Sequence, residues 1–197
     1  MRDTELTTRP THLLLIDATT LRTARLDIVC GTLAMAEAEL HDLGLFAELV
    51  NAEVPAMWPP PLNDEDSQRW LMELLKTTPP GWSNWYMVRR AESGKGTLVG
   101  NIGFKGGPSD DGTVEIGYSV LEAHQRNGYA SEAVNTMVAF AFSDTMITRV
   151  TAHTLPELTP SIGVLTKCGF RFLGTGTEGP ETILFERTRP MHEHVDG

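Results

Sequence analysis

The sequence feature that most constrains the fold is a strand, a polar loop and a helix in direct succession between Thr113 and Ser143. In the first part, apolar side chains alternate with polar residues or glycine, which is the pattern of a β-strand. The alternating apolar residues are Val114, Ile116, Tyr118 and Val120. In the last part, apolar residues from Ala133 to Phe142 recur with helical spacing and form one stripe. The chain therefore predicts a strand that leads into an amphipathic helix through a short loop.

The loop from Gln125 to Ala130 has chemical properties that suit an anion. The first N–H groups of a helix have no intrahelical partner, and the helix dipole adds partial positive charge there. Gly128 and Ala130 have little or no side chain, so an anion can approach the backbone, and Arg126 adds a formal charge. The pattern is typical of a phosphate or pyrophosphate site, and it is also compatible with an ordinary helix start that contains a glycine.

A wider pattern resembles a known family. Gln125, Gly128 and Ala130 fill the Q/R-x-x-G-x-G/A pattern, which is similar to the acetyl-CoA signature of the GCN5-related N-acetyltransferases (GNAT). Further segments resemble that family, and in particular its RimJ/RimL-like branch, in the same order: residues 58–60, 100–104, 114–118 and 161–170. The resemblance implies an α/β protein with the GNAT fold, in which helices flank a central mixed, mostly antiparallel twisted sheet of about seven strands.

We expect one domain over residues 1–197, with residues 1–8 and 189–197 as flexible tails. The remaining strands are expected at 12–17, 84–89, 97–104, 149–154, 170–175 and 182–187. The remaining helices are expected at 20–28, 34–49, 67–76 and 161–168. Prolines exclude helix and central strand from residues 54–62, so that segment is expected to be a stiff loop carrying Trp58.

The composition of the chain limits the classes of partner that we expect for this protein. The net charge of −10 argues against a general nucleic-acid-binding protein and is compatible with a cationic amine substrate. No apolar run approaches the ~20 residues that span a bilayer, and the N-terminus lacks the apolar segment of a secretory signal, so we expect a cytoplasmic protein without a membrane partner. Cys30 and Cys168 are expected to be buried thiols, and no metal-binding motif is present.

The resemblance implies that acetyl-CoA is the co-substrate and that its acetyl group passes directly to a primary amine in a ternary complex. The amine could belong to a protein N-terminus or to a small molecule. The residues implied to hold the pyrophosphate end are Gln125, Arg126, Asn127, Gly128, Tyr129, Ala130 and Ser131. The backbone N–H near Val120 is the implied donor to the oxyanion. A CoA-binding sensor with little turnover is the alternative from another functional class, and a homodimer is compatible with the family.

Two residues are candidates for proton transfer. Glu115 lies on the central strand, where GNAT enzymes often place a carboxylate base; it could equally be structural, and binding could instead select the neutral amine. Leu165 occupies the position at which the family usually has a tyrosine that acts as the acid. The resemblance to the RimJ/RimL-like branch implies a serine acid instead, and Ser161 lies at the matching place, although a capping hydrogen bond explains this serine slightly better. Leu158 replaces an asparagine that is common in the family.

The acceptor side has weaker candidates. Trp58 is the residue most suited to an acceptor pocket because its loop is stiff. The acidic residues of the early helical region are expected either to form a solvated helix face or to attract the amine of the acceptor. They are Glu37, Glu39, Asp42 and Glu48.

Overall fold

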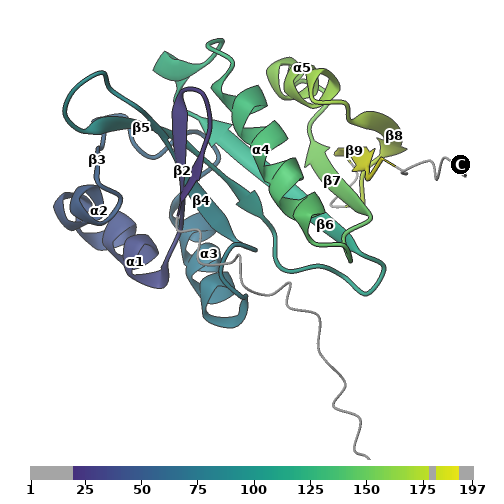
Figure 1. Ribbon diagram of the computed structural model, residues 1–197, viewed down its shortest axis with the longest axis horizontal. Coiled ribbons are helices and arrows are strands. Elements are labelled where there is room, and N and C mark those ends of the chain that lie inside the picture. Colours follow the sequence, from purple (N-terminus) through teal and green to yellow (C-terminus); the bar gives the residue numbers. More distant parts are fainter. Residues whose placement is uncertain (1–19, 178–180, 191–197) are drawn as a thin grey trace, which may run out of the picture.

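The computed structural model describes residues 20–177 and 181–190, which form a twisted sheet with helices on both faces (Figure 1). The strands are β1 (Thr20–Arg22), β2 (Leu26–Cys30), β3 (Ala52–Glu53), β4 (Asn84–Arg89), β5 (Gly96–Phe104), β6 (Thr113–Val120), β7 (Arg149–Thr154), β8 (Arg171–Thr175) and β9 (Ile183–Thr188). The helices are α1 (Leu33–His41), α2 (Leu43–Leu49), α3 (Glu65–Thr77), the 3-10 turn η1 (Glu122–His124), α4 (Tyr129–Ser143) and α5 (Thr159–Lys167). The strand expected at 12–17 and the greater part of both expected tails lie outside the described residues.

The strands lie in the order β1-β2-β4-β5-β6-β7-β9-β8, and β3 pairs with the beginning of β5. Neighbouring strands are antiparallel, except for the parallel pairs β6–β7 and β3–β5. The expected mixed, mostly antiparallel sheet is confirmed. It has nine strands within the described residues, because β1, β2 and β3 were not foreseen, whereas the other six correspond to expected strands.

Side chains of the central strand β4 alternate between two cores. Trp85 and Met87 belong to the larger core, which α4 and α5 cover. Tyr86 and Val88 belong to the smaller core, together with Phe46 of α2. Because a strand presents successive side chains to opposite faces, α1 and α2 lie on the face of the sheet opposite to α4. Figure 1 shows α4 across the front of the sheet and α1, α2 and α3 grouped at its lower left.

In the N-terminal part, two of the helices expected from the sequence differ from the structure. Residues 20–28 are not helical but form the hairpin of β1 and β2, in which Leu26 and Ile28 are buried on alternate positions. The helix expected at 34–49 is divided at Asp42, whose carboxylate accepts from the backbone N–H groups of Gly44 and Leu45 and so begins α2. An N-cap residue has non-helical backbone angles, which explains the break.

Glu39 is a third correction, because it lies in the interior and not on a solvated acidic face. Only 5% of its surface is exposed. Its carboxylate accepts hydrogen bonds from the indole N–H of Trp58, the hydroxyl of Tyr86 and the side-chain amide of Asn63. A buried carboxylate requires such donors, and here they attach the proline-rich loop to α1.

Candidate active site

The parallel ladder between β6 and β7 is short. It pairs Thr113 with Arg149, Val114 with Val150 and Glu115 with Thr151, and it ends there. β7 continues to Thr154 paired only with β9, while β6 continues to Val120 paired only with β5. Within the described residues, the second half of β6 therefore has an open edge on the β7 side.

Hydrogen bonds to β5 fix the direction of the β6 backbone. The carbonyl of Glu115 accepts from the N–H of Lys105, and the N–H of Leu121 donates to the carbonyl of Val99. Because backbone groups alternate in direction along a strand, those of Ile116, Tyr118 and Val120 point toward the open edge. The Val120 carbonyl already accepts from the side chain of Gln125, at 3.1 Å. The N–H of Val120, predicted as an oxyanion donor, thus faces the open edge of the sheet.

The open edge leads into the loop before α4. Gln125 ties this loop to the end of β6, and the Asn127 side chain donates to the carbonyls of His124 and Gln125. Gly128 precedes the helix with a φ of +80°, and no side chain caps the helix at this position. The first N–H groups of α4 therefore have no acceptor within the helix and none from a capping side chain. They point out of the helix end, as in helix termini that bind anions.

The remaining predicted loop residues differ in exposure. Arg126 is exposed, with a φ of +61°. Tyr129 and Ala130 are half-buried against the larger core, and Ser131 is buried. Exposure therefore leaves the Arg126 guanidinium accessible to a bound anion, whereas Ser131 can contribute only from inside the first turn.

Arg25, which the sequence did not single out, lies beside this loop. It comes from the turn between β1 and β2 and donates to the carbonyl of Asn127 at 2.8 Å. Its guanidinium stacks over the ring of Tyr129, with 4.8 Å between the guanidinium carbon and the ring centroid. A side chain at Gly128 would stand 3.4 Å from Nη2 of Arg25. Two arginines therefore border the start of α4 in a chain that is acidic as a whole.

Glu132 holds Arg25 in place. Its carboxylate forms a 2.8 Å salt bridge with Arg25 and also accepts from the hydroxyl of Thr23. Burial alone would raise the pKa of Glu132, but the hydrogen bonds from Thr23 and Arg25 outweigh burial and lower it. The carboxylate is thus ionised at neutral pH, and the hairpin is fixed to the first turn of α4.

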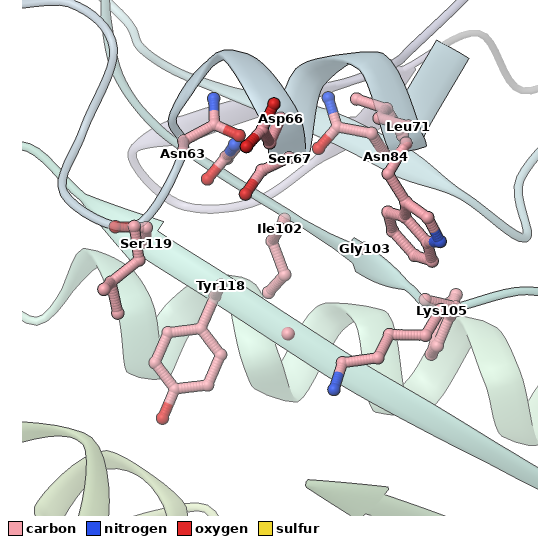
Figure 2. Close-up of a pocket in the computed structure, with 15 residues that line it drawn as sticks. Asn63, Asp66, Ser67, Leu71, Asn84, Ile102, Gly103, Lys105, Tyr118 and Ser119 are labelled. Atoms are coloured by element: carbon pink, nitrogen blue, oxygen red, sulfur yellow. The ribbon is translucent and has the colours of Figure 1, made fainter. Parts of the chain in front are cut away.

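A groove of about 480 Å³ lies on the other face of the sheet, between α3 and strands β5 and β6 (Figure 2). The polar groups that line it include Asn63, Asp66, Ser67, Asn84, Asn101, Lys105 and Ser119. Its apolar wall includes Leu62, Trp70 and Leu71. The loop that carries Leu62 is fixed to β6, because the Ser119 hydroxyl donates to the carbonyl of Pro61 at 2.7 Å.

Two paired glycines leave the floor of the groove bare. Gly103 of β5 is the cross-strand partner of Gly117 of β6, and both line the groove. A Cβ at Gly103 would lie 2.1 Å from the carbonyl oxygen of Ser83, so this position cannot hold a side chain. A Cβ at Gly117 would have no neighbour within 4 Å. The room above Gly117 is therefore open to a ligand, and its glycine is not required for packing.

Glu115, the predicted base, is engaged in ionic and hydrogen-bonding contacts. Its Oε1 lies 2.5 Å from the ammonium of Lys105 and 2.9 Å from Nδ1 of His153. The backbone N–H of Thr177 donates to Nε2 of His153, so Nδ1 carries the proton and donates to Glu115. This carboxylate connects β5, β6 and β7 at the point where the β6–β7 ladder ends.

Two predicted site residues do not lie together. Glu115 and Val120 are five residues apart on one strand, which corresponds to about 17 Å. A base must lie within hydrogen-bond reach of its proton, directly or through a water. If the carbonyl carbon of a thioester is held at Val120, Glu115 is too distant to contact the attacking amine.

Ser161, the predicted acid, lies in the first turn of α5 and contacts Tyr118. The Tyr118 hydroxyl is 3.2 Å from both the carbonyl oxygen and Oγ of Ser161. Leu165 is fully buried in the larger core, and Leu158 precedes α5 without a side-chain cap. The hydroxyl pair Tyr118–Ser161 therefore stands at the open edge, on the face covered by α4 and α5.

Trp58, predicted for the acceptor pocket, is buried in the smaller core and is not among the residues that line the groove. Its indole N–H donates to Glu39 at 3.0 Å. The loop contributes to the groove through Leu62 and Asn63 instead. Trp58 thus anchors its loop in the smaller core without lining the groove. The stiff loop in turn positions Leu62 and Asn63, which do line it.

Three residues at the candidate site were not indicated by the sequence. Arg25 and Tyr118 reach the site through contacts with residues far away in the chain, such as Ser161, which is 43 positions from Tyr118. Lys105 reaches it across a strand pair, through Glu115. A lone arginine, lysine or strand tyrosine has no local pattern that indicates such a contact. In the part of the chain that the structure describes, no group of three or more metal-binding side chains occurs, and no helix is both long and apolar enough to cross a bilayer.

The fold and site define a mixed α/β protein in which an open sheet edge leads to a helix terminus without a side-chain cap. A family profile described as Acetyltransferase (GNAT) domain matches residues 32–171, which is more than half of the chain. The chain therefore belongs to the GNAT acetyltransferase domain family.

Individual relatives agree with this assignment. The Bacillus subtilis (strain 168) protein described as uncharacterized N-acetyltransferase YjdG is 32% identical over 90 residues, which are 46% of this chain and 52% of that protein. The aligned part of the chain thus spans about half the length of this curated relative.

Two solved structures share the fold. RimL, a ribosomal L7/L12 alpha-N-protein acetyltransferase, has a TM-score of 0.58 at 16% identity, with 86% of this chain and 94% of that chain covered. The microcin C7 self-immunity acetyltransferase MccE, in complex with acetyl-CoA and AMP, has a TM-score of 0.56 at 14% identity, with 84% and 93% covered. At these identities the likeness concerns the fold alone.

Proposed function

We propose that this protein is an N-acetyltransferase that moves the acetyl group of acetyl-CoA to a primary amine within a ternary complex. The observation that carries the proposal is the continuity of the open edge of β6 with the uncapped start of α4, beside Arg25 and Arg126. A pantetheine arm is extended and amide-containing, so it can pair with an unpaired strand edge. A pyrophosphate suits the helix terminus and its arginines.

In this proposal the predicted residues have two roles, which depend on where they lie in the site. The loop residues Gln125 to Ala130 and the first turn at Ser131 form the pyrophosphate site, and the Val120 N–H is the donor to the oxyanion. Membership in the GNAT family and the acetyl-CoA complex of MccE support acetyl-CoA as the co-substrate. No step requires a covalent intermediate on the protein, because a thiolate is a fair leaving group.

We propose that the acceptor amine enters from the groove on the α3 face. Gly117 leaves room at its floor, close to the open edge of the sheet. Amide and hydroxyl groups of Asn63, Asn101 and Ser119 line the groove and can pair with the polar backbone of a peptide. A protein N-terminus is therefore the first acceptor class to test. The fold likeness to RimL is compatible with it, and small amines form the second class.

The ionic contacts of Glu115 favour a structural role over that of a base. Its carboxylate is paired with Lys105 and accepts from His153, and it is about 17 Å along the strand from Val120. We therefore propose that the groove binds the neutral amine, or that solvent takes its proton. Glu115 would then serve to define where β6 and β7 separate.

The test is calorimetric titration with acetyl-CoA, followed by a panel of peptides and small amines while thiol release is recorded. Binding followed by thiol release would support the proposal. Binding without release from any amine would favour the CoA-binding sensor. No binding would contradict both functions.

Gly128→Glu places a carboxylate at the start of α4, and we expect it to abolish acetyl-CoA binding. Gly94→Glu is the matched control, because Gly94 has the same φ of +80° and no neighbour within 4 Å of a Cβ. Both substitutions carry the same backbone strain and added charge, so only a specific site at Gly128 predicts different affinities. Equal affinities would exclude this loop as the pyrophosphate site.

A further inference from the structure

Tyr118 connects the two faces of the candidate active site. It lines the groove on the α3 face, and its hydroxyl contacts Ser161 of α5 on the other face. Figure 2 shows its side chain extending from β6 away from α3, on the opposite side from Asn63 and Ser67. The residue therefore stands where a reacting group would pass from the cofactor side of the sheet to the acceptor side.

The contact with Ser161 places the Tyr118 hydroxyl on the face of α4 and α5, which is the side of the leaving group in the proposed function. The N–H groups of Tyr118 and Val120 face the same open edge and are about 7 Å apart along the strand. A thioester whose carbonyl is held at this edge would present its carbon to the groove. Its sulfur would stay on the side of α4, where the rest of the cofactor lies in the proposed function.

The site contains one phenol in this position and no other aromatic hydroxyl from α5. Leu165 is apolar and fully buried, so it cannot donate. The Ser161 hydroxyl is within 3.2 Å of the Tyr118 hydroxyl and can donate to it. The phenol itself donates to the carbonyl of Ser161 at 3.2 Å. A thiolate is a charged acceptor, and a hydrogen bond to a charged acceptor is stronger than one to a neutral carbonyl, so the phenolic proton would turn to the sulfur when the thiolate forms.

We propose that the Tyr118 hydroxyl donates a hydrogen bond to the CoA sulfur as the thiolate departs, and that Ser161 acts as a positioning residue for this hydroxyl. The proposal rests on the proposed function. The amine nitrogen forms a bond to the acetyl carbon, the C–S bond breaks, and its electron pair stays on sulfur. The phenolic proton remains on Tyr118, and the proton released by the amine goes to solvent, from which the thiolate is later protonated.

The acidity of Tyr118 agrees with a donor that keeps its proton. Burial raises its pKa to about 12, against a smaller opposing effect of the hydrogen bond with Ser161. A thiol has a pKa of about 8.5, so full proton transfer from this phenol to a thiolate is unfavourable. A hydrogen bond to the thiolate is favourable at every pH at which the phenol stays protonated.

The test uses CoA itself and requires no acceptor. Ultraviolet difference titration gives the thiol pKa of CoA bound to the wild-type protein, to Tyr118→Phe and to Ser161→Ala. A hydrogen bond to a charged group predicts that Tyr118→Phe raises the thiol pKa by about one unit. Ser161→Ala is expected to raise it less, because the phenolic proton remains. Phenylalanine keeps the ring packing, and circular dichroism with thermal unfolding verifies the fold.

The outcomes separate this proposal from the proposed function. Failure of CoA to bind the wild-type protein would overturn both. Binding with the same thiol pKa in wild type and Tyr118→Phe would overturn only the role of Tyr118. An equal or larger shift in Ser161→Ala would make Ser161 the donor and would also overturn it. With an amine that reacts, Tyr118→Phe should lower kcat about tenfold, with the KM for acetyl-CoA unchanged and the loss constant between pH 6 and 9.

Discussion

Oε1 of Glu115 lies 2.9 Å from Nδ1 of His153, and this contact joins β6 to β7 at the last pair of their parallel ladder. Two residues further along, the strands no longer pair. Because Lys105, which directly follows β5, contacts the same carboxylate oxygen, segments from three neighbouring strands meet at one side chain. The contact marks the boundary between the paired and open halves of β6, and the candidate active site begins there.

The first prediction concerns this boundary. Glu115→Gln removes the charge that pairs with Lys105, so we expect the free energy of unfolding to fall by about 1–2 kcal/mol. We also expect weaker acetyl-CoA binding and a pH–rate profile of unchanged shape. Denaturant unfolding and calorimetry measure these quantities. Glu73→Gln is the control, since the pair of Glu73 with Lys76 is on the surface. A profile that loses its acidic limb would restore Glu115 as the base.

The second prediction concerns the floor of the groove. Gly117→Val adds a side chain where no atom lies within 4 Å of a Cβ, so the fold should remain intact. Valine is favoured in strands, and its methyl groups would occupy the room for an acceptor. We expect at least a tenfold loss of amine-dependent thiol release, with unchanged affinity for acetyl-CoA. Gly107→Val, also without a neighbour, is the control outside the groove lining. Undiminished turnover would mean that acceptors bind elsewhere.

The third prediction concerns Arg25. Arg25→Ala removes a guanidinium from the loop before α4, and we expect the Kd for acetyl-CoA to rise about tenfold. Arg22→Ala removes the same charge from the same hairpin, but that side chain is 74% exposed and pairs with Asp27, so it should change the affinity little. Titrations at two salt concentrations give the electrostatic part. Equal effects of the two substitutions would indicate a general charge effect without a specific contact.

The sequence predicts the centre of the site well because the signal there is local. The alternation from Val114 to Val120 and the glycine at position 128 are visible within a few residues, and the structure has β6 and α4 where they were expected. The hairpin at residues 20–30 was mistaken for a helix. Its period-2 burial at Leu26 and Ile28 extends over too few residues to distinguish the two periodicities.

What the sequence cannot provide is the identity of long-range partners. Glu39 sits among acidic residues that are exposed, such as Glu37, and only the packing of Trp58 and Tyr86 against it explains its burial. Likewise, the family resemblance predicts a base at Glu115, but its contacts with Lys105 and His153 come from other segments of the sheet. Such pairs follow from sheet order and register, which local patterns do not specify.

The fourth prediction concerns the pH dependence of stability at Glu39. Burial raises the pKa of this carboxyl above its ordinary value of 4.5, although hydrogen bonds from Tyr86, Trp58 and Asn63 oppose the shift. The folded state therefore holds the proton more tightly than the unfolded state does. Its contribution to stability is full below pH 4.5 and is lost as the pH rises through the raised pKa of the folded state.

Glu39→Gln cannot ionise, so its free energy of unfolding should increase relative to that of wild type as the pH rises from 4.5 toward neutrality. Urea unfolding at a series of pH values measures the difference. Glu37→Gln, an exposed position on the same helix, should give a curve parallel to that of wild type. A parallel curve for Glu39→Gln would show that the carboxyl has the same pKa in both states.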